Sequence, residues 1–204
     1  MENYKNMAIF ILLYFSLIIG FYFDENLNFG SYNDWLAGNL PAILDFSNNF
    51  QKTFINYENY GHRHSPVYLI FLSLFLKSGI DIDIVRLIHL HLCLILIFIF
   101  YKCLLLKFKD INKSTLQILS FVVFLSPTFR SLSIWPDSRL PGLTLFIFSV
   151  YYLLKFINKS DIKYAWYSST LLILSSYISP NFSIFALYFY FFYFKKLNFL
   201  EFTK

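Results

Sequence analysis

The stretch SIWPDSRLPG, residues 133–142, holds a carboxylate and a guanidinium two positions apart, between two long apolar runs. Asp137 and Arg139 are accompanied by Trp135, a residue type enriched at membrane interfaces, and by two prolines that fix the backbone. A plain connector needs only polar residues and a helix breaker. The acid and base together indicate a functional loop at membrane level, with a simple ion pair worth under about 1 kcal/mol as the alternative.

Other carboxylates and cations flank the apolar runs in the same way. Asp24 and Glu25 follow the first run, and Asp34 comes shortly after them. A carboxylate can take a proton from an acceptor, and the arginine fork matches the oxygens of a phosphate leaving group. The cations and titratable groups expected on the same side are His62, Arg63, His64, Arg86, Arg130 and Arg139.

Transmembrane helices must position these residues. Of the 204 residues, 57% are hydrophobic and only 14% are charged, and the charges lie between long apolar runs. Since a spanning helix needs about 20 mostly apolar residues, we predict an all-α integral membrane protein, a single membrane domain over residues 1–204. Six spans are expected, at about 7–23, 84–106, 115–132, 140–156, 164–179 and 182–195.

Lysines decide the expected topology. If the apolar run 65–76 does not cross, the lysine-rich loops near residues 102–113 and 155–163 share one side with both termini. The positive-inside rule makes that side cytoplasmic. The net charge of +5 then follows from topology, so membrane lipid and not nucleic acid is the expected partner. The first run lacks an A-x-A site and is expected to be an uncleaved anchor.

The expected outer loop, residues 24–83, is long for a connector and has its own pattern. Apolar residues at helical spacing predict an amphipathic surface helix over about 34–46, with Asp34 as its N-cap and Trp35 as an interfacial anchor. A dozen apolar residues predict a second surface helix over about 65–77, which is short for a span.

Cysteines and the remaining histidines do not form a metal-binding pattern. Cys93 and Cys103 would lie about 15 Å apart along one helix, too far for a disulfide. His89 and His91 point in different directions on that helix, so we expect them to contact neighbouring helices or lipid headgroups.

The order of these features resembles the GT-C glycosyltransferases, particularly the bacterial lipid-linked sugar transferases and the protein O-mannosyltransferase-like group. In that family a first span leads into a long outer loop with an acidic motif. Juxtamembrane helices, a His-Pro-Pro or similar turn, a short apolar helix, a Gly and an Arg follow, and the next outer loop carries a second acid. This chain contains, in that order over about residues 7–156, FDENLNFG and NDW, then HSPVYLIFLSLFLKSGIDIDIVR, then LSPTFRSLSIWPDSR.

The resemblance implies transfer of a sugar from a polyprenyl-phosphate donor to a glycan, lipid or protein acceptor, with inversion at the anomeric carbon. The active face would be periplasmic or extracellular, on a bacterial inner membrane. No cofactor is firmly implied, and a divalent metal remains open. Because family members are usually longer, a truncated chain is expected. The alternative is a non-catalytic membrane protein: a transporter fragment, an assembly partner or an inactive remnant.

The resemblance also implies roles for individual residues. Asp34 would be the general base or orient the acceptor, with Asp24 in the DE pair as the other candidate for that role. Asp137 would position the donor, the acceptor or a metal ion. The acidic candidates are Asp34, Asp137, Asp24 and Glu25, and the candidates for binding the donor phosphate are Arg63, His64, Arg139 and Arg130.

Overall fold

The chain folds into a set of helices in a computed structural model that describes residues 2–27, 29–61 and 64–196. No β-strand occurs in these residues, which agrees with the all-α prediction. The elements are α1 (Glu2–Tyr22), α2 (Phe29–Asp34), the π-helical turn η1 (Trp35–Asn39), α3 (Leu40–Asn48), α4 (Phe50–Ile55), η2 (Tyr57–Tyr60), α5 (Val67–Lys77), α6 (Ile82–Lys107), α7 (Lys113–Phe121), η3 (Val122–Leu125), α8 (Pro127–Ile134), α9 (Arg139–Lys159), α10 (Ile162–Ile178), η4 (Pro180–Phe185) and α11 (Ala186–Lys196).

Three helices of the described chain are long and apolar enough to cross a membrane: Tyr4–Tyr22 within α1, α6 and α9. A fourth span arises if α7–η3 and α8 count as one broken helix, bent by 66°. The expectation of six spans was therefore too high. The helix over 113–134 breaks before Pro127, and α10 and α11 have only 17 and 11 residues. Each is shorter than the ~20 residues that a bilayer core requires.

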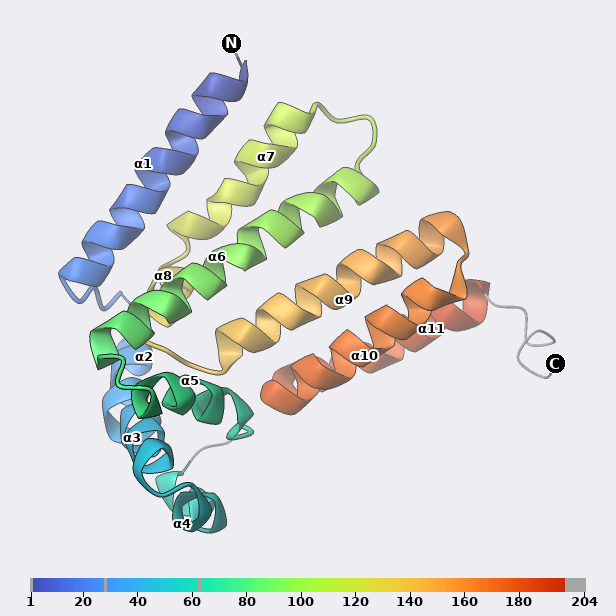
Figure 1. The fold of residues 1–204 in the computed structure, drawn as a ribbon. Helices are drawn as coiled ribbons and strands as arrows, with labels where there is room; N and C mark the ends of the chain where they lie inside the picture. Colours follow the sequence, from blue (N-terminus) through green and yellow to red (C-terminus); the bar gives the residue numbers. More distant parts are fainter. Residues whose placement is uncertain (1, 28, 62–63, 197–204) are drawn as a thin grey trace.

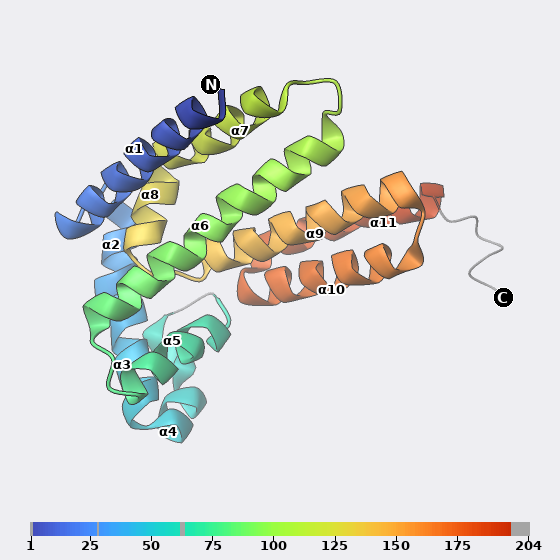
Figure 2. The same ribbon diagram turned by 45° about the horizontal axis from the view of Figure 1, so that its top comes forward.

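The long helices share one bundle, and the short helices α2–α5 lie together at one end of it (Figure 1). The start of α1, the end of α6 and the start of α7 meet at the other end, which holds Lys5, Lys107 and Lys113 (Figures 1 and 2). A polar contact joins two of these helices there, since Asn6 Nδ2 donates to Ser114 Oγ at 2.9 Å.

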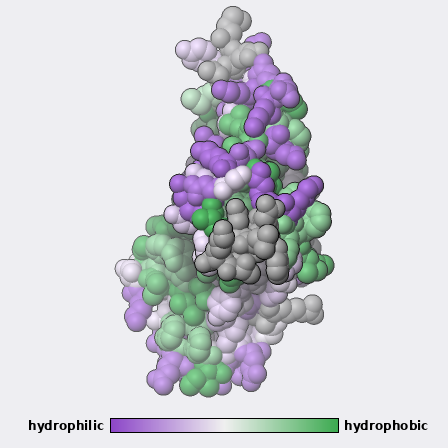
Figure 3. Space-filling model, turned by 90° about the vertical axis from the view of Figure 1, so that its right-hand side faces the viewer, coloured by the Kyte–Doolittle hydropathy of each residue, from purple (hydrophilic) through white to green (hydrophobic). Residues whose placement is uncertain are grey.

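Hydrophilic side chains also gather where α9 and α11 end and α10 begins, on the face seen in Figure 3. Lys155, Lys159 and Lys163 belong to the α9–α10 turn region, and Lys195 and Lys196 close α11. Most lysines of the described residues thus lie at one end of the helices, whereas α2–α5, with Lys52 and Lys77, and the start of α9 lie at the other.

Helix α6 lies at the centre of the packing and contacts α5, α7, α8 and α9. The pair α9–α10 approaches closely because small residues face each other. Ser168 Oγ donates to the Ser149 carbonyl oxygen, and Ser175 Oγ donates to that of Gly142, both at 2.7 Å. A Cβ on Gly142 would lie 2.7 Å from Ser179 Cβ, so this position requires glycine. Small residues serve helix contacts inside membranes in the same way.

Both tryptophans near the expected outer face are buried. Trp35 and Trp135 are each only 3% exposed, so the prediction that they anchor the chain at the membrane interface was wrong. Trp135 packs edge-on against Tyr32, and its ring lies 4.1 Å from the Arg86 guanidinium carbon. These rings form part of the core between α2, α6 and α8.

Candidate functional site

The loop between α8 and α9 places Asp137 two residues before Arg139, the first residue of α9. Asp137 Oδ1 accepts the backbone N–H of Arg139 at 2.7 Å, which folds the loop back on the helix start. The Arg139 side chain then reaches the same carboxylate twice, from Nε to Oδ1 at 2.8 Å and from Nη2 to Oδ2 at 3.0 Å. This two-point contact fixes the orientation of the guanidinium.

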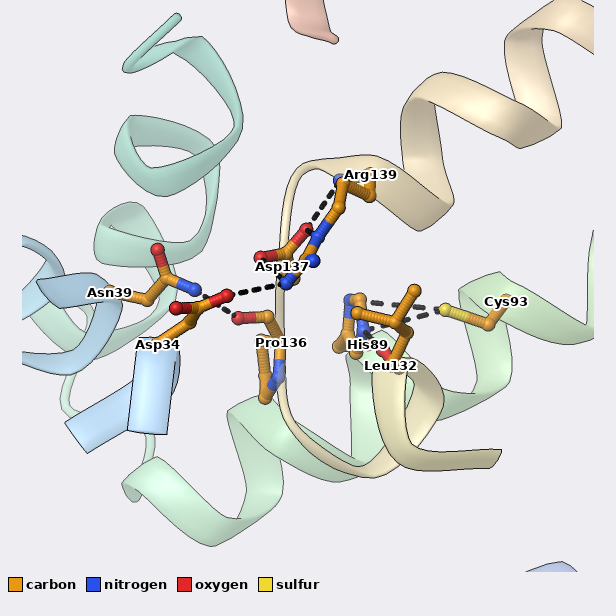
Figure 4. Close-up of polar contacts among 8 residues, drawn as sticks. All are labelled: Asp34, Asn39, His89, Cys93, Leu132, Pro136, Asp137 and Arg139. Carbon is orange, nitrogen blue, oxygen red and sulfur yellow. Dashed lines mark hydrogen bonds and ion pairs between the residues drawn. The ribbon is translucent and has the colours of Figure 1, made fainter. Parts of the chain in front are cut away.

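Asp34 comes from a different part of the fold and meets the same arginine. Arg139 Nη2 donates to Asp34 Oδ2 at 2.6 Å, so one guanidinium bridges two carboxylates (Figure 4). We call Asp34, Asp137 and Arg139 the ion triad. The structure therefore joins the acid of the first expected outer loop to the acid and base of the second.

The π-helical turn explains how the first loop presents two residues to this place. The Leu40 N–H donates to the Trp35 carbonyl oxygen five residues back, and the chain continues without a break into α3. In an α-helix, residues five apart lie about 140° apart around the axis, whereas a π-turn, whose hydrogen bond joins residues five apart, brings such residues onto the same side. Asp34 and Asn39 therefore face the same cavity.

A cavity of about 660 Å³ lies beside the ion triad. Its size falls within the ~300–1,000 Å³ typical of small-molecule sites. His64 and Asn181 line it together with the ion triad, and Tyr60 forms another part of the wall. The structure thus gathers Asp34, His64, Asp137 and Arg139, four of the eight predicted site residues, around one space.

The two carboxylates of the ion triad differ in environment. The Asp137 side chain is 5% exposed, whereas that of Asp34 is 53% exposed. Burial acts to raise the pKa of Asp137, but the hydrogen bonds and charge of Arg139, with a smaller effect of His64, outweigh it and lower the pKa. Asp137 is therefore a fixed anion that holds Arg139, and Asp34 is the carboxylate open to a ligand.

Buried contacts hold both ends of the loop that carries Asp137. Asn39 Nδ2 donates to the Pro136 carbonyl oxygen at 2.9 Å, and Asn39 is only 4% exposed. The fully buried His89 lies 2.8 Å, through Nε2, from the carbonyl oxygen of Leu132 at the other end (Figure 4). Because a carbonyl only accepts, Nε2 carries the proton and Nδ1 accepts from the Tyr68 hydroxyl. His89 thus contacts neighbouring helices, as expected, and it positions the loop.

The other predicted acids lie outside this cavity. Asp24 Oδ1 accepts from Arg86 Nη2 at 2.8 Å, and Glu25 Oε1 accepts from Arg130 Nε at 2.6 Å. A second contact, from Arg130 Nη2 to Glu25 Oε2, makes that pair two-pronged. These residues connect α1 to α6 and to α8. Their surroundings are those of structural ion pairs, which the sequence did not distinguish from the ion triad.

The structure tests further predictions about Asp34, the surface helices and the cysteines, and not all of them are correct. Asp34 makes no capping hydrogen bond and lies in a continuous helical segment, so the N-cap prediction was wrong. The expected surface helix over 34–46 is observed as η1 followed by α3, and the one over 65–77 as α5. Both cysteines are free. Arg63 falls outside the described residues.

Asn39, Tyr60 and Asn181 are members of the site that the sequence did not single out. Asn39 is the one for which the sequence held a signal, as a polar residue inside the apolar stretch LAGNLPAIL. Tyr60 and Asn181 reach the cavity from η2 and η4, and neither short helix was predicted. Asn181 lies far from Asp34 along the chain, so no local sequence pattern indicates that the two residues share a site.

The residues of the site do not match a metal centre. Within the described part of the chain, no group of three or more His, Cys, Asp or Glu side chains is arranged to hold a metal ion. Asp34 and Asp137 both use an oxygen on Arg139.

Comparisons with known proteins find no relative: no family model matches this sequence, nor does any curated protein or solved structure. The function has to be inferred from the chemistry of the site itself.

Proposed function

We propose that this chain is a glycosyltransferase of the GT-C type. It would move a sugar from a polyprenyl-phosphate donor to an acceptor hydroxyl at the end of the bundle that holds α2–α5. The observation that carries the proposal is the ion triad, in which Arg139 bridges Asp34 and Asp137 at the wall of a cavity next to helices long enough to span a membrane.

Asp34 is the better placed of the two carboxylates to accept a proton. It is half exposed, lines the cavity and makes one side-chain hydrogen bond among the described residues, to Arg139. In the reaction the acceptor oxygen attacks the anomeric carbon and its proton passes to Asp34. The bond from that carbon to the phosphate oxygen breaks, and the electron pair leaves with the polyprenyl phosphate.

Arg139 is the group suited to the leaving phosphate. Its Nε and Nη2 are used by the carboxylates, but Nη1 makes no hydrogen bond to the described residues, and the side chain is 33% exposed. A phosphate that engages Nη1 and competes for Nη2 would displace Asp34 and not Asp137, because Asp137 is held by three hydrogen bonds. Donor binding would thereby release the base where it is needed.

His64 completes the donor side of the proposal. It lines the cavity and lies close enough to Asp137 for its charge to lower the pKa of that carboxyl. A lipid-linked donor fits because its tail can stay among the apolar helices while the phosphate reaches the helix ends. The pair Glu25–Arg130 has no part in the reaction, since neither residue lines the cavity.

Sugar transfer by the purified chain, reconstituted with polyprenyl-phosphate-linked sugars, tests the proposal. We expect Asp34→Asn to lower the transfer rate by about 10²–10⁴-fold, the usual contribution of a general base. Asp24→Asn is the matched control, because it removes an equally exposed carboxylate outside the cavity. Wild-type rates in Asp34→Asn would overturn the proposal.

The second candidate is a non-catalytic membrane protein in which the ion triad only joins α2 to α9. Arg139 is favoured for that role because Asp34 and Asp137 already compensate its charge. In that case Asp34→Asn would weaken the fold, and transfer would be absent from the wild type. A wild type that transfers sugar, together with a stable Asp34→Asn variant that does not, would argue against this candidate.

A further inference from the structure

A second polar cavity, of about 440 Å³, lies in the short-helix end of the molecule between α3, α4 and η2. Four of its lining residues are asparagines: Asn48, Asn49, Asn56 and Asn59. Every lining side chain carries a hydrogen-bonding group, and none is aliphatic. Such a polar wall is unusual in this apolar protein, and its hydrogen-bonding groups determine which kind of ligand it can bind.

Amide side chains supply donors and acceptors from the same group. A sugar hydroxyl also donates and accepts, so an amide wall pairs well with a ligand rich in hydroxyls. Two of the amides are already used for helix ends: Asn49 Oδ1 accepts from the Lys52 N–H, and Asn56 Nδ2 donates to the Lys52 carbonyl oxygen. Asn48 and Asn59 make no side-chain hydrogen bond within the described residues and are exposed.

The charges of the wall favour a neutral ligand. Asp45 and Lys52 are the charged residues in this cavity, and their formal charges cancel. A phosphate-bearing ligand would be expected to meet an excess of Arg or Lys, since those side chains provide the strong contacts to phosphate. In this cavity Lys52 is the one cationic residue of the described lining, and the asparagines beside it are neutral.

Tyr60 connects this cavity to the proposed active site. It lines both spaces, and its hydroxyl donates to Asp45 on the side of the asparagines. A chain-like ligand resting on the asparagines could therefore pass Tyr60 and present its end to Asp34. The wall is built on the helices α3 and α4 and on η2, so it is held by backbone hydrogen bonds.

We propose that the asparagine-lined cavity binds a neutral carbohydrate and is the acceptor subsite. Its role as an acceptor subsite rests on the proposed transfer reaction, but the binding of carbohydrate does not. Asn48 and Asn59 are the principal hydrogen-bonding residues, and Tyr60 marks the boundary with the reacting end.

Direct binding of neutral trisaccharides tests this inference. Chitotriose, cellotriose and mannotriose are titrated against the full chain in nanodiscs and followed by saturation-transfer NMR, with trigalacturonate as the acidic counterpart. We expect at least one neutral sugar to bind. Asn48→Ala and Asn59→Ala should each weaken it about fivefold, and the double variant at least tenfold. Both positions are exposed and hold no helix end, so the variants should fold.

Matched controls separate the two proposals. Gln51→Ala removes an exposed amide from α4, beside the cavity but not lining it, and this variant should bind as the wild type does. Asp24→Asn, a change outside both cavities, should also bind as the wild type does. Binding by none of the neutral sugars, binding that the double variant leaves unchanged, or a preference for trigalacturonate each overturns the carbohydrate site. A wild type that binds these sugars but transfers none refutes only the transferase.

Discussion

The ion pair between Glu25 and Arg130 offers the sharpest test of the distinction between structural and reacting carboxylates. Arg130 joins α8 to α1, since it also donates from Nη2 to the Ser16 carbonyl oxygen at 3.0 Å. The two side chains are only 18% and 11% exposed, and they meet through two parallel contacts. Glu25→Gln removes the charge and keeps the shape, leaving the guanidinium without its anion.

Removing one partner of a buried pair costs about 3–5 kcal/mol. The Gln amide oxygen still accepts one hydrogen bond, and both groups keep some solvent, so we expect a loss of about 2–3 kcal/mol. For a chain of this size that lowers the unfolding temperature by roughly 5–10 °C. The double variant with Arg130→Gln should be no less stable than the worse single variant, because the stranded charge is gone.

Thermal unfolding in detergent micelles measures these changes, with Asp24→Asn as the matched control. Asp24 is 62% exposed and its partner Arg86 keeps Asp83, so this change should cost under about 1 kcal/mol. Gly20→Ala provides an independent check, since a Cβ there would lie 2.3 Å from Glu25 Oε2 and should disturb the pair. The structural assignment would be refuted if Glu25→Gln were as stable as Asp24→Asn. It would also be refuted if Glu25→Gln kept its stability but lost sugar transfer.

Other parts of the fold give predictions of their own. Gly142→Ala should cost about 1–3 kcal/mol in unfolding experiments, because its Cβ would overlap Ser179 across the α9–α10 contact. Asn39→Ala should leave the buried Pro136 carbonyl without its partner, costing about 1–3 kcal/mol and slowing transfer, and Asn39→Asp should not restore the donor. The pKa of Asp137 is lowered from 3.8, so its stabilisation is complete above about pH 4 and disappears as pH falls through the lower folded value. The difference in unfolding temperature between wild type and Asp137→Asn should then be constant from pH 8 to 5 and shrink only below about pH 4.

The convergence of Asp34, Asp137 and Arg139 could be expected from the sequence because charge placement alone assigned both loops to one side. The pairings of Asp24 and Glu25 could not. Which arginine meets which acid depends on how α1 packs against α6 and α8, and no local pattern encodes that packing. Sequence proximity to the first span made the two acids resemble site residues.

The predictions of six spans and of interfacial tryptophans were wrong for a different reason. Hydropathy counts apolar residues but does not show where a helix stops, as at Pro127 and around Pro180. An aromatic residue beside a polar loop suits an interface and a core equally well by composition. Trp135 is buried in the core, where the buried Arg86 guanidinium stacks on its ring.

The π-helical turn at Trp35–Asn39 holds one residue more than ordinary α-helical winding needs, and Asp34 and Asn39 are five apart across it. If this segment rewound as an α-helix at the same length, the two side chains would lie about 140° apart around the axis and could not both face the cavity. Deleting one residue inside the turn would instead leave them four apart in an α-helix, about 40° apart, so both would still face it. A single-codon deletion at the exposed Ala37 should therefore be tolerated better than one inside α3, which has no surplus residue and where the deletion would rotate Asp34 by about 100° relative to the residues that follow.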